Sequence, residues 1–168
     1  MRRQADWLGW HATKLNMILF LDFDGVLHPE LIGAPDDFVC RPHLWKVLRT
    51  CPDVNVVFST SWRELHTVQE LIDFSTHGGG EDLVHRFIGS TPYIVHEPGT
   101  FLPSPYYRRE RECRLWLTGN DHQQSSWLVV DDYARYFSPL LPALYTVDPR
   151  TGLTDKDAEK LIERLNGC

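Results

Sequence analysis

Two carboxylates one residue apart follow the first apolar run of this chain. The run 17–21 is apolar throughout, and Asp22, Asp24 and Gly25 come after it. Such a run is typical of a strand buried on both faces inside a parallel sheet. Open α/β sheets bind ligands beyond the carboxyl ends of their strands, where unpaired carboxylates are costly. Asp22 and Asp24 therefore indicate a site for a hard cation such as Mg²⁺, which takes carboxylate and phosphate oxygens.

Two further apolar runs also end in groups suited to chemistry. The run 54–58 leads into the hydroxyl residues 59–61, and the run 127–130 leads into Asp131 and Asp132. Because the carboxyl ends of parallel strands meet at one edge of a sheet, we expect these groups to gather there with an arginine from the helix before the third run. Carboxylates, hydroxyls and an arginine are the groups that metal-assisted phosphoryl transfer requires.

The elements that would position these groups alternate along the chain. Apolar periodicity and turn residues predict strands over 17–21, 54–58, 86–88, 127–130 and 144–147, and helices over 42–50, 64–74, 107–117 and 154–165. Thr154 and Asp157 have the spacing of a capping pair at the start of the last helix. The alternation predicts an α/β fold with a parallel sheet covered by helices on both faces.

Length and composition favour one ordered domain. A chain of 168 residues with 42% apolar content is long enough for a full core, which we expect over 17–168 after an extension over 1–16 of unknown role. The formal charge of −6 lacks the basic excess typical of nucleic-acid binding, but a local basic groove is not excluded. The sequence has no apolar run long enough for a membrane span. Its four cysteines lack zinc-ligand spacing and indicate reduced thiols in a cytoplasmic protein.

Several motifs resemble, in order, those of a known family. They are Asp-Phe-Asp-Gly-Val-Leu-His-Pro over 22–29, Ser-Thr-Ser-Trp-Arg over 59–63, Arg-x-x-Glu-x-x-x-Trp-Leu over 109–117, Val-Val-Asp-Asp over 129–132 and Gly-Leu-Thr over 152–154. They resemble the haloacid dehalogenase (HAD) superfamily of aspartate-nucleophile phosphatases, and within it the small HAD domain related to Swiss Army Knife RNA-repair proteins. The resemblance implies a three-layer α/β/α sandwich with a central parallel sheet and Mg²⁺ as cofactor. With no large insert between motifs, it also implies a minimal cap or none.

The resemblance implies unequal roles for the first two aspartates. Asp22 would be the nucleophile that forms an aspartyl phosphate, and Asp24 the general acid/base for the leaving oxygen and then for water. Asp24 must hold a proton for the first step, which neighbouring carboxylates favour and a metal opposes. The implied Mg²⁺ ligands are Asp22, the backbone carbonyl of Asp24, and Asp131 and Asp132. Which of the last two binds directly stays open.

The resemblance also implies groups that bind the substrate phosphate. Thr60 is the expected hydroxyl, with Ser61 beside it, and the register leaves Ser59 as an alternative. Hydroxyls at this place also commonly cap the following helix. Arg109 matches the expected cation, with Arg108 as its alternative.

Three other residues within these motifs have competing interpretations. Arg63 either reaches the phosphate or is a surface charge, the more common role of an arginine. His28 either lines the substrate entrance or is a partly buried loop histidine. Trp62 is expected in the core.

Together these features predict a Mg²⁺-dependent phosphatase that acts on an unidentified phosphomonoester through an aspartyl phosphate. One alternative is a polynucleotide-end phosphatase for RNA or DNA repair, suggested by the RNA-repair resemblance but not by the net charge. Another is a catalytically silent, Mg²⁺-binding regulatory module. The presence of both Asp22 and Asp24 argues against the silent module. No membrane partner is expected, and the oligomeric state is left open.

Overall fold

A computed structural model describes residues 17–30, 37–94 and 107–167. These residues form a five-stranded sheet with the order β3-β2-β1-β4-β5, in which all neighbouring strands run parallel. The strands are β1 (Met17–Leu21), β2 (Val54–Phe58), β3 (Phe87–Ser90), β4 (Trp127–Asp131) and β5 (Leu144–Thr146). The predicted parallel sheet is therefore confirmed, whereas the predicted extension over 1–16 lies outside the described residues.

The central strand β1 is buried on both faces, as its apolar run predicts. Ile18 and Phe20 pack into a hydrophobic cluster on one side of the sheet, and Leu19 and Leu21 pack into a larger cluster on the other. All five residues of β1 are buried. A strand with apolar contacts on both faces has a fixed position in the sheet, so the residue that follows it is also held in place.

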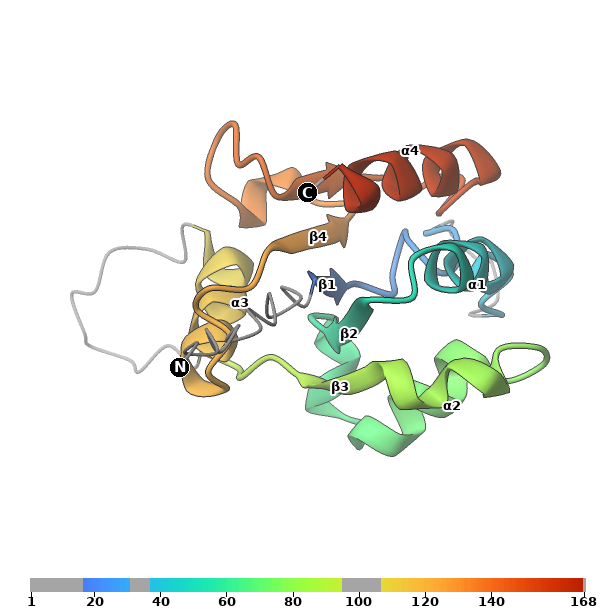
Figure 1. Cartoon of the computed structure of the whole chain (residues 1–168), viewed down its shortest axis with the longest axis horizontal. Helices are drawn as coiled ribbons and strands as arrows, with labels where there is room; N and C mark the ends of the chain where they lie inside the picture. Colours follow the sequence, from blue (N-terminus) through green and yellow to red (C-terminus); the bar gives the residue numbers. More distant parts are fainter. Residues whose placement is uncertain (1–16, 31–36, 95–106, 168) are drawn as a thin grey trace, which may run out of the picture.

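Helices cover both faces of the sheet (Figure 1). The helices are α1 (Arg41–Thr50), α2 (Val68–Thr76), α3 (Arg108–Gly119) and α4 (Asp155–Asn166). Buried apolar residues of α1, α2 and α4 belong to the larger cluster, and those of α3 belong to the smaller one on the opposite face. The structure is thus the predicted three-layer α/β/α sandwich. Residues 95–106, part of the longest segment between predicted motifs, lie outside the described residues.

Helix α2 begins later than the predicted range 64–74. A short 3-10 helix, η1 (Ser61–Glu64), follows β2, and α2 starts only after Thr67. The Thr67 hydroxyl accepts a hydrogen bond from the Glu70 N–H, while the Glu70 carboxylate accepts one from the Thr67 N–H at 2.7 Å. This capping box satisfies the first backbone donors of the helix and so fixes where it starts. The predicted capping pair of Thr154 and Asp157 is confirmed at α4.

The structure bears on the membrane spans and on the cysteine thiols, but it does not test the predicted location. In the described residues, no helix combines the length and apolar character needed to cross a membrane. Cys40, Cys51 and Cys113 are buried free thiols. The cytoplasmic location stays a prediction.

Candidate active site

The register of the sheet places Asp22 beside the ends of two other strands. Leu21 pairs with Phe58 of β2 on one side and with Val130 of β4 on the other. The Asp22 N–H donates to the Val130 carbonyl at 3.1 Å, and the Ser59 N–H donates to the Leu21 carbonyl at 2.9 Å. After β3 the chain crosses to β4 on the other side of β1, so the strand order reverses between the neighbouring strands β1 and β4. Open α/β sheets bind ligands at such a point.

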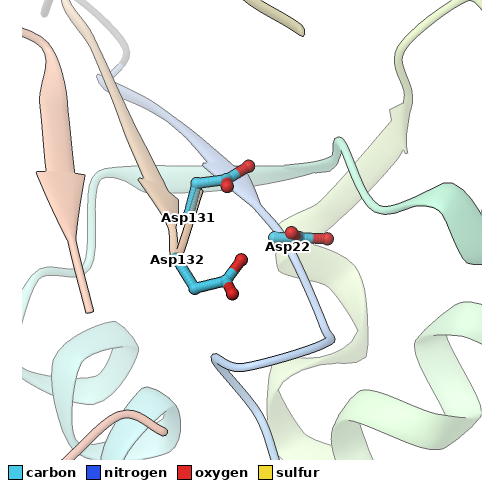
Figure 2. A group of neighbouring side chains, drawn as sticks. All are labelled: Asp22, Asp131 and Asp132. Carbon is cyan, nitrogen blue, oxygen red and sulfur yellow. The ribbon is translucent and has the colours of Figure 1, made fainter. Parts of the chain in front are cut away.

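Three carboxylates converge at this edge of the sheet. Asp22 extends from the end of β1, and Asp131 and Asp132 extend from the end of β4 (Figure 2). One oxygen from each lies within 4.8 Å of the others. Asp22 and Asp131 are buried, while Asp132 is half-buried. We call these three residues the acidic cluster.

Arg109, from α3, neutralises part of the acidic cluster. Its Nη1 lies 2.6 Å from Asp22 Oδ2 and 2.9 Å from Asp131 Oδ2. Burial opposes the positive charge of Arg109, but Asp22 and Asp131 outweigh it, and the pKa of Arg109 is raised. Of the two candidate arginines, Arg109 is therefore the one that the structure brings to Asp22, while Arg108 lies next to it in sequence.

Arg109 does not balance the acidic cluster completely. Burial, and then the charge of Asp22, raise the pKa of Asp131 well above its usual range. The same causes, in the same order, raise the pKa of Asp132 to about 6. Both oxygens of Asp131 already have partners, because Oδ2 contacts Arg109 and Oδ1 accepts the Tyr133 N–H at 2.8 Å. Asp132 is the more accessible of the two predicted ligands.

A pocket of about 340 Å³ opens above the acidic cluster. Most of the residues predicted from the sequence line it, namely Asp22, Asp24, Ser61, Arg108, Arg109 and Asp132. Glu30, Tyr133 and Tyr136 also line it, and the sequence motifs gave no signal for them. The pocket therefore combines acidic groups with arginine and tyrosine side chains.

Gly25 allows the loop after β1 to approach the acidic cluster closely. Its φ angle is 65°, and a Cβ atom at this position would lie 2.7 Å from the Cγ atom of Asp132. That distance is too short for any side chain, and the left-handed backbone conformation favours glycine as well. Gly25 therefore lets Asp24 and Asp132 share one pocket.

Asp24 is held by two side chains whose contacts with it the motifs did not predict. The Trp62 Nε1–H lies 3.0 and 3.2 Å from its two carboxylate oxygens, and His28 Nε2 lies 3.4 Å from Oδ1. The contact with His28 is the main cause that lowers the pKa of Asp24, and the hydrogen bond from Trp62 contributes further. Burial opposes this effect but does not outweigh it. Trp62 is half-buried and packs against the larger hydrophobic cluster, in part as expected, and it also contacts a predicted catalytic residue. His28 is buried rather than exposed at an entrance.

The hydroxyl residues after β2 differ in position. Thr60 is fully buried, and its Oγ1 accepts the Trp62 N–H at 3.3 Å, so it caps η1. Ser61 lines the pocket, whereas Ser59 is fully buried. Of the two hydroxyls predicted to bind phosphate, the structure therefore brings Ser61 to the pocket and uses Thr60 as a cap. The capping alternative described for this segment is observed.

Arg63 is neither a surface charge nor a pocket residue. Its guanidinium is buried, pairs with Glu112 of α3 at 2.6 Å, and donates to the carbonyls of Ser59 and Thr91 at 2.9 and 3.1 Å. It also donates to the carbonyl of Thr60. Arg63 therefore fastens the segment after β2 to α3, the helix that carries Arg109.

Comparison with known proteins places this arrangement in a family. The family model described as "HAD domain in Swiss Army Knife RNA repair proteins" matches residues 18–158. The chain belongs to this HAD family. The match includes the acidic cluster and every described residue of the pocket named above. No curated protein and no solved structure matches the chain.

The acidic cluster of this HAD domain is chemically suited to Mg²⁺. Mg²⁺ prefers oxygen ligands and is commonly held by one or two carboxylates with phosphate and water oxygens. The acidic cluster supplies three carboxylates with oxygens within 4.8 Å of one another. Burial, and then the charge of Asp22, raise the pKa values of Asp131 and Asp132, and a bound divalent cation would oppose both effects by favouring the ionised carboxylates.

Proposed function

We propose that this HAD domain is a Mg²⁺-dependent phosphomonoesterase that acts through an aspartyl phosphate. The observation that carries the proposal is the convergence of Asp22, Asp131 and Asp132 at a pocket that Asp22, Asp24 and Asp132 line. A carboxylate nucleophile, a second carboxylate for proton transfer and a fixed cation are suited to phosphoryl transfer. Membership of the HAD family supports a hydrolase of this type.

The proposed reaction has two displacements at phosphorus. A carboxylate oxygen of Asp22 attacks the phosphorus atom, the bond from phosphorus to the leaving alcohol breaks, and the Asp24 proton moves to the leaving oxygen. Asp24 then takes a proton from water while the water oxygen attacks the same phosphorus atom. The bond from phosphorus to Asp22 breaks, which releases inorganic phosphate and restores the Asp22 carboxylate.

Asp24 needs different protonation states in the two steps. His28 and Trp62 lower its pKa and so favour the ionised form in the free site, which is the form required to activate water. A phosphate dianion beside Asp24 would raise its pKa by repulsion. We propose that substrate binding supplies the proton-holding form for the first displacement.

The acidic cluster, with the backbone carbonyl of Asp24, would hold Mg²⁺, and Asp132 is its most accessible side-chain ligand. Bound Mg²⁺ would stabilise negative charge on the transferring oxygens. Arg109 holds Asp22 and Asp131 in place through its 2.6 and 2.9 Å contacts. Ser61 is the hydroxyl available to the substrate in the same pocket.

Hydrolysis of 4-nitrophenyl phosphate in Mg²⁺ and in EDTA tests this proposal. We expect turnover that requires Mg²⁺ and that falls by about a thousandfold or more in Asp22→Asn, because the nucleophile is lost. Asp121→Asn is a matched control at an exposed position and should keep the activity of the natural protein. The proposal fails if a broad phosphate panel gives no metal-dependent turnover, or if Asp22→Asn is as active as the control.

A second candidate, a polynucleotide-end phosphatase, is favoured by the family description, which names RNA repair proteins. The net charge of −6 argues against broad electrostatic binding of nucleic acid. A panel that includes oligonucleotides with terminal phosphates would separate the candidates. A kcat/KM for those ends well above that for small phosphomonoesters would favour the second.

A further inference from the structure

Arg108 is a cation of the pocket that the acidic cluster does not use. Arg109, the next residue, is engaged by Asp22 and Asp131. Arg108 lines the same pocket, and its side chain is 24% exposed. Among the described residues, its Nε atom has no hydrogen-bond partner. Because the Nε atom is itself buried, a ligand in the pocket would reach the exposed part of the Arg108 side chain rather than Nε.

The neighbouring carboxylate of Glu112 forms a long ion pair with Arg108 but accepts no hydrogen bond from its Nε atom. Glu112 Oε1 lies 3.8 Å from the Arg108 Nε, which is beyond hydrogen-bond distance. Arg63 holds the other oxygen of Glu112 at 2.6 Å, and the Ile94 N–H donates to Oε1 at 3.2 Å. The hydrogen bonds of Glu112 therefore go to other partners, and its ion pair with Arg108 is a long one.

Two tyrosines hold the guanidinium of Arg108 in position. Its Cζ atom lies over the Tyr93 ring at 5.3 Å from the centroid and over the Tyr136 ring at 5.6 Å. Tyr136 is also a pocket residue. Contacts with aromatic faces stabilise an arginine while leaving its N–H groups free to donate. A fixed guanidinium with free N–H groups is suited to bind the oxygens of a carboxylate or a phosphate.

We propose that Arg108 is a specificity residue that selects phosphomonoesters whose leaving group carries a second oxyanion. The inference rests on the proposed phosphatase activity and names the substrate class for that site. The phosphate to be cleaved lies at Asp22, and the second oxyanion, either carboxylate or phosphate, binds the N–H groups of Arg108. Both residues line one pocket of about 340 Å³, so one small substrate can reach both.

Three small substrates test the selection directly. Ethyl phosphate has no charged group besides the phosphate to be cleaved. Phosphoglycolate adds a carboxylate, and ethylene glycol bisphosphate adds a second phosphate. We expect the natural protein to hydrolyse at least one charged substrate with a kcat/KM about tenfold or more above that for ethyl phosphate, the gain expected for a charge-assisted hydrogen bond. The charged substrate with the larger gain identifies the oxyanion that Arg108 binds.

Arg108→Gln and Arg111→Gln form a matched pair of variants. Both remove a guanidinium from α3, but Arg111 is exposed and does not line the pocket. In Arg108→Gln, the ratio of kcat/KM for the preferred charged substrate to that for ethyl phosphate should fall about tenfold. Arg111→Gln should keep the ratio of the natural protein. The ratio in the natural protein needs no variant and so tests the inference even if Arg108→Gln folds poorly.

The outcomes separate this inference from the proposed function. Turnover of ethyl phosphate with no preference for either charged substrate overturns the role of Arg108 and leaves the phosphatase proposal standing. An unchanged ratio in folded Arg108→Gln also overturns it. Absence of metal-dependent turnover on all three substrates and on 4-nitrophenyl phosphate refutes the phosphatase proposal, and the inference with it.

Discussion

Replacement of Arg109 by methionine tests whether this residue neutralises the acidic cluster. Its side chain is 5% exposed and contacts Asp22 and Asp131 at 2.6 and 2.9 Å. Methionine fills similar space but has no charge, so both carboxylates lose their cation while they stay buried. Removal of one partner from a buried ion pair costs about 3–5 kcal/mol of unfolding free energy. For a domain of this size, the melting temperature should fall by about 6–20 °C.

The loss should depend on pH and on Mg²⁺. Burial and Asp22 already raise the pKa of Asp131, and the charge of Arg109 is what opposes them. A carboxyl pKa that is raised in the folded protein does not lower the unfolding free energy below the unfolded pKa. The loss grows as the pH rises from the unfolded pKa to the folded pKa and is complete above it. Because the pKa of Asp131 is already about 8 in the natural protein, Arg109→Met should be less destabilising at pH 5 than at pH 9. Millimolar Mg²⁺ should restore part of the stability at pH 7.5, because it binds the folded cluster.

Urea unfolding in EDTA and in Mg²⁺, at pH 5, pH 7.5 and pH 9, measures these differences. Arg111→Gln is the control, since an exposed substitution on the same helix should change stability by less than about 0.5 kcal/mol. An unfolding free energy of Arg109→Met within 1 kcal/mol of the natural protein at pH 7.5 in EDTA, about the size of an exposed ion pair, would refute the assigned role of Arg109.

Three further substitutions address other parts of the site. Asp132→Asn should stabilise the metal-free protein by about 1 kcal/mol at pH 8 but not at pH 4, because burial and Asp22 raise the pKa of Asp132 to about 6 and so disfavour its ionised form. The effect is kept small by the partial exposure of Asp132 to solvent. Thermal unfolding in EDTA checks this, and a destabilised variant at pH 8 would contradict it. Trp62→Phe removes a donor to Asp24 and should raise the pKa that Asp24 contributes to the pH profile of kcat; an unmoved profile counts against the contact. Arg63→Met should cost about 3–5 kcal/mol in urea unfolding, because Glu112 stays buried without its partner; a raised KM with unchanged stability would instead indicate a substrate contact.

The sequence predicted the features that depend on short-range patterns. The uninterrupted apolar run 17–21 coincides with β1, because a strand buried on both faces needs such a segment, and the run 54–58, apolar except for the half-buried Asn55, coincides with β2. Parallel strands align their carboxyl ends, so the convergence of Asp22 with Asp131 and Asp132 followed from their places after those runs. The capping box at α4 likewise depends only on residues within one turn.

The features that the sequence did not predict depend on packing between distant segments. The contact of Trp62 with Asp24 arises from the way η1 folds back over the end of β1, and a tryptophan in this place looked like a core residue. Arg63 pairs with Glu112 across the gap between β2 and α3, and neither residue signals its partner. The choice of Ser61 over Thr60 as the pocket hydroxyl depends on a single residue of register.

The central claim is that Asp22 becomes phosphorylated. Asp24→Asn should slow release of the phosphoryl group, and 4-nitrophenyl phosphate has a leaving group that needs little protonation, so the covalent intermediate should accumulate. Mass mapping of the acid-quenched protein should find one phosphoryl group on the peptide that contains Asp22, and none in the Asp22→Asn, Asp24→Asn double variant. A protein that turns over substrate with no phosphoryl adduct, or with the adduct on another residue, would contradict the account.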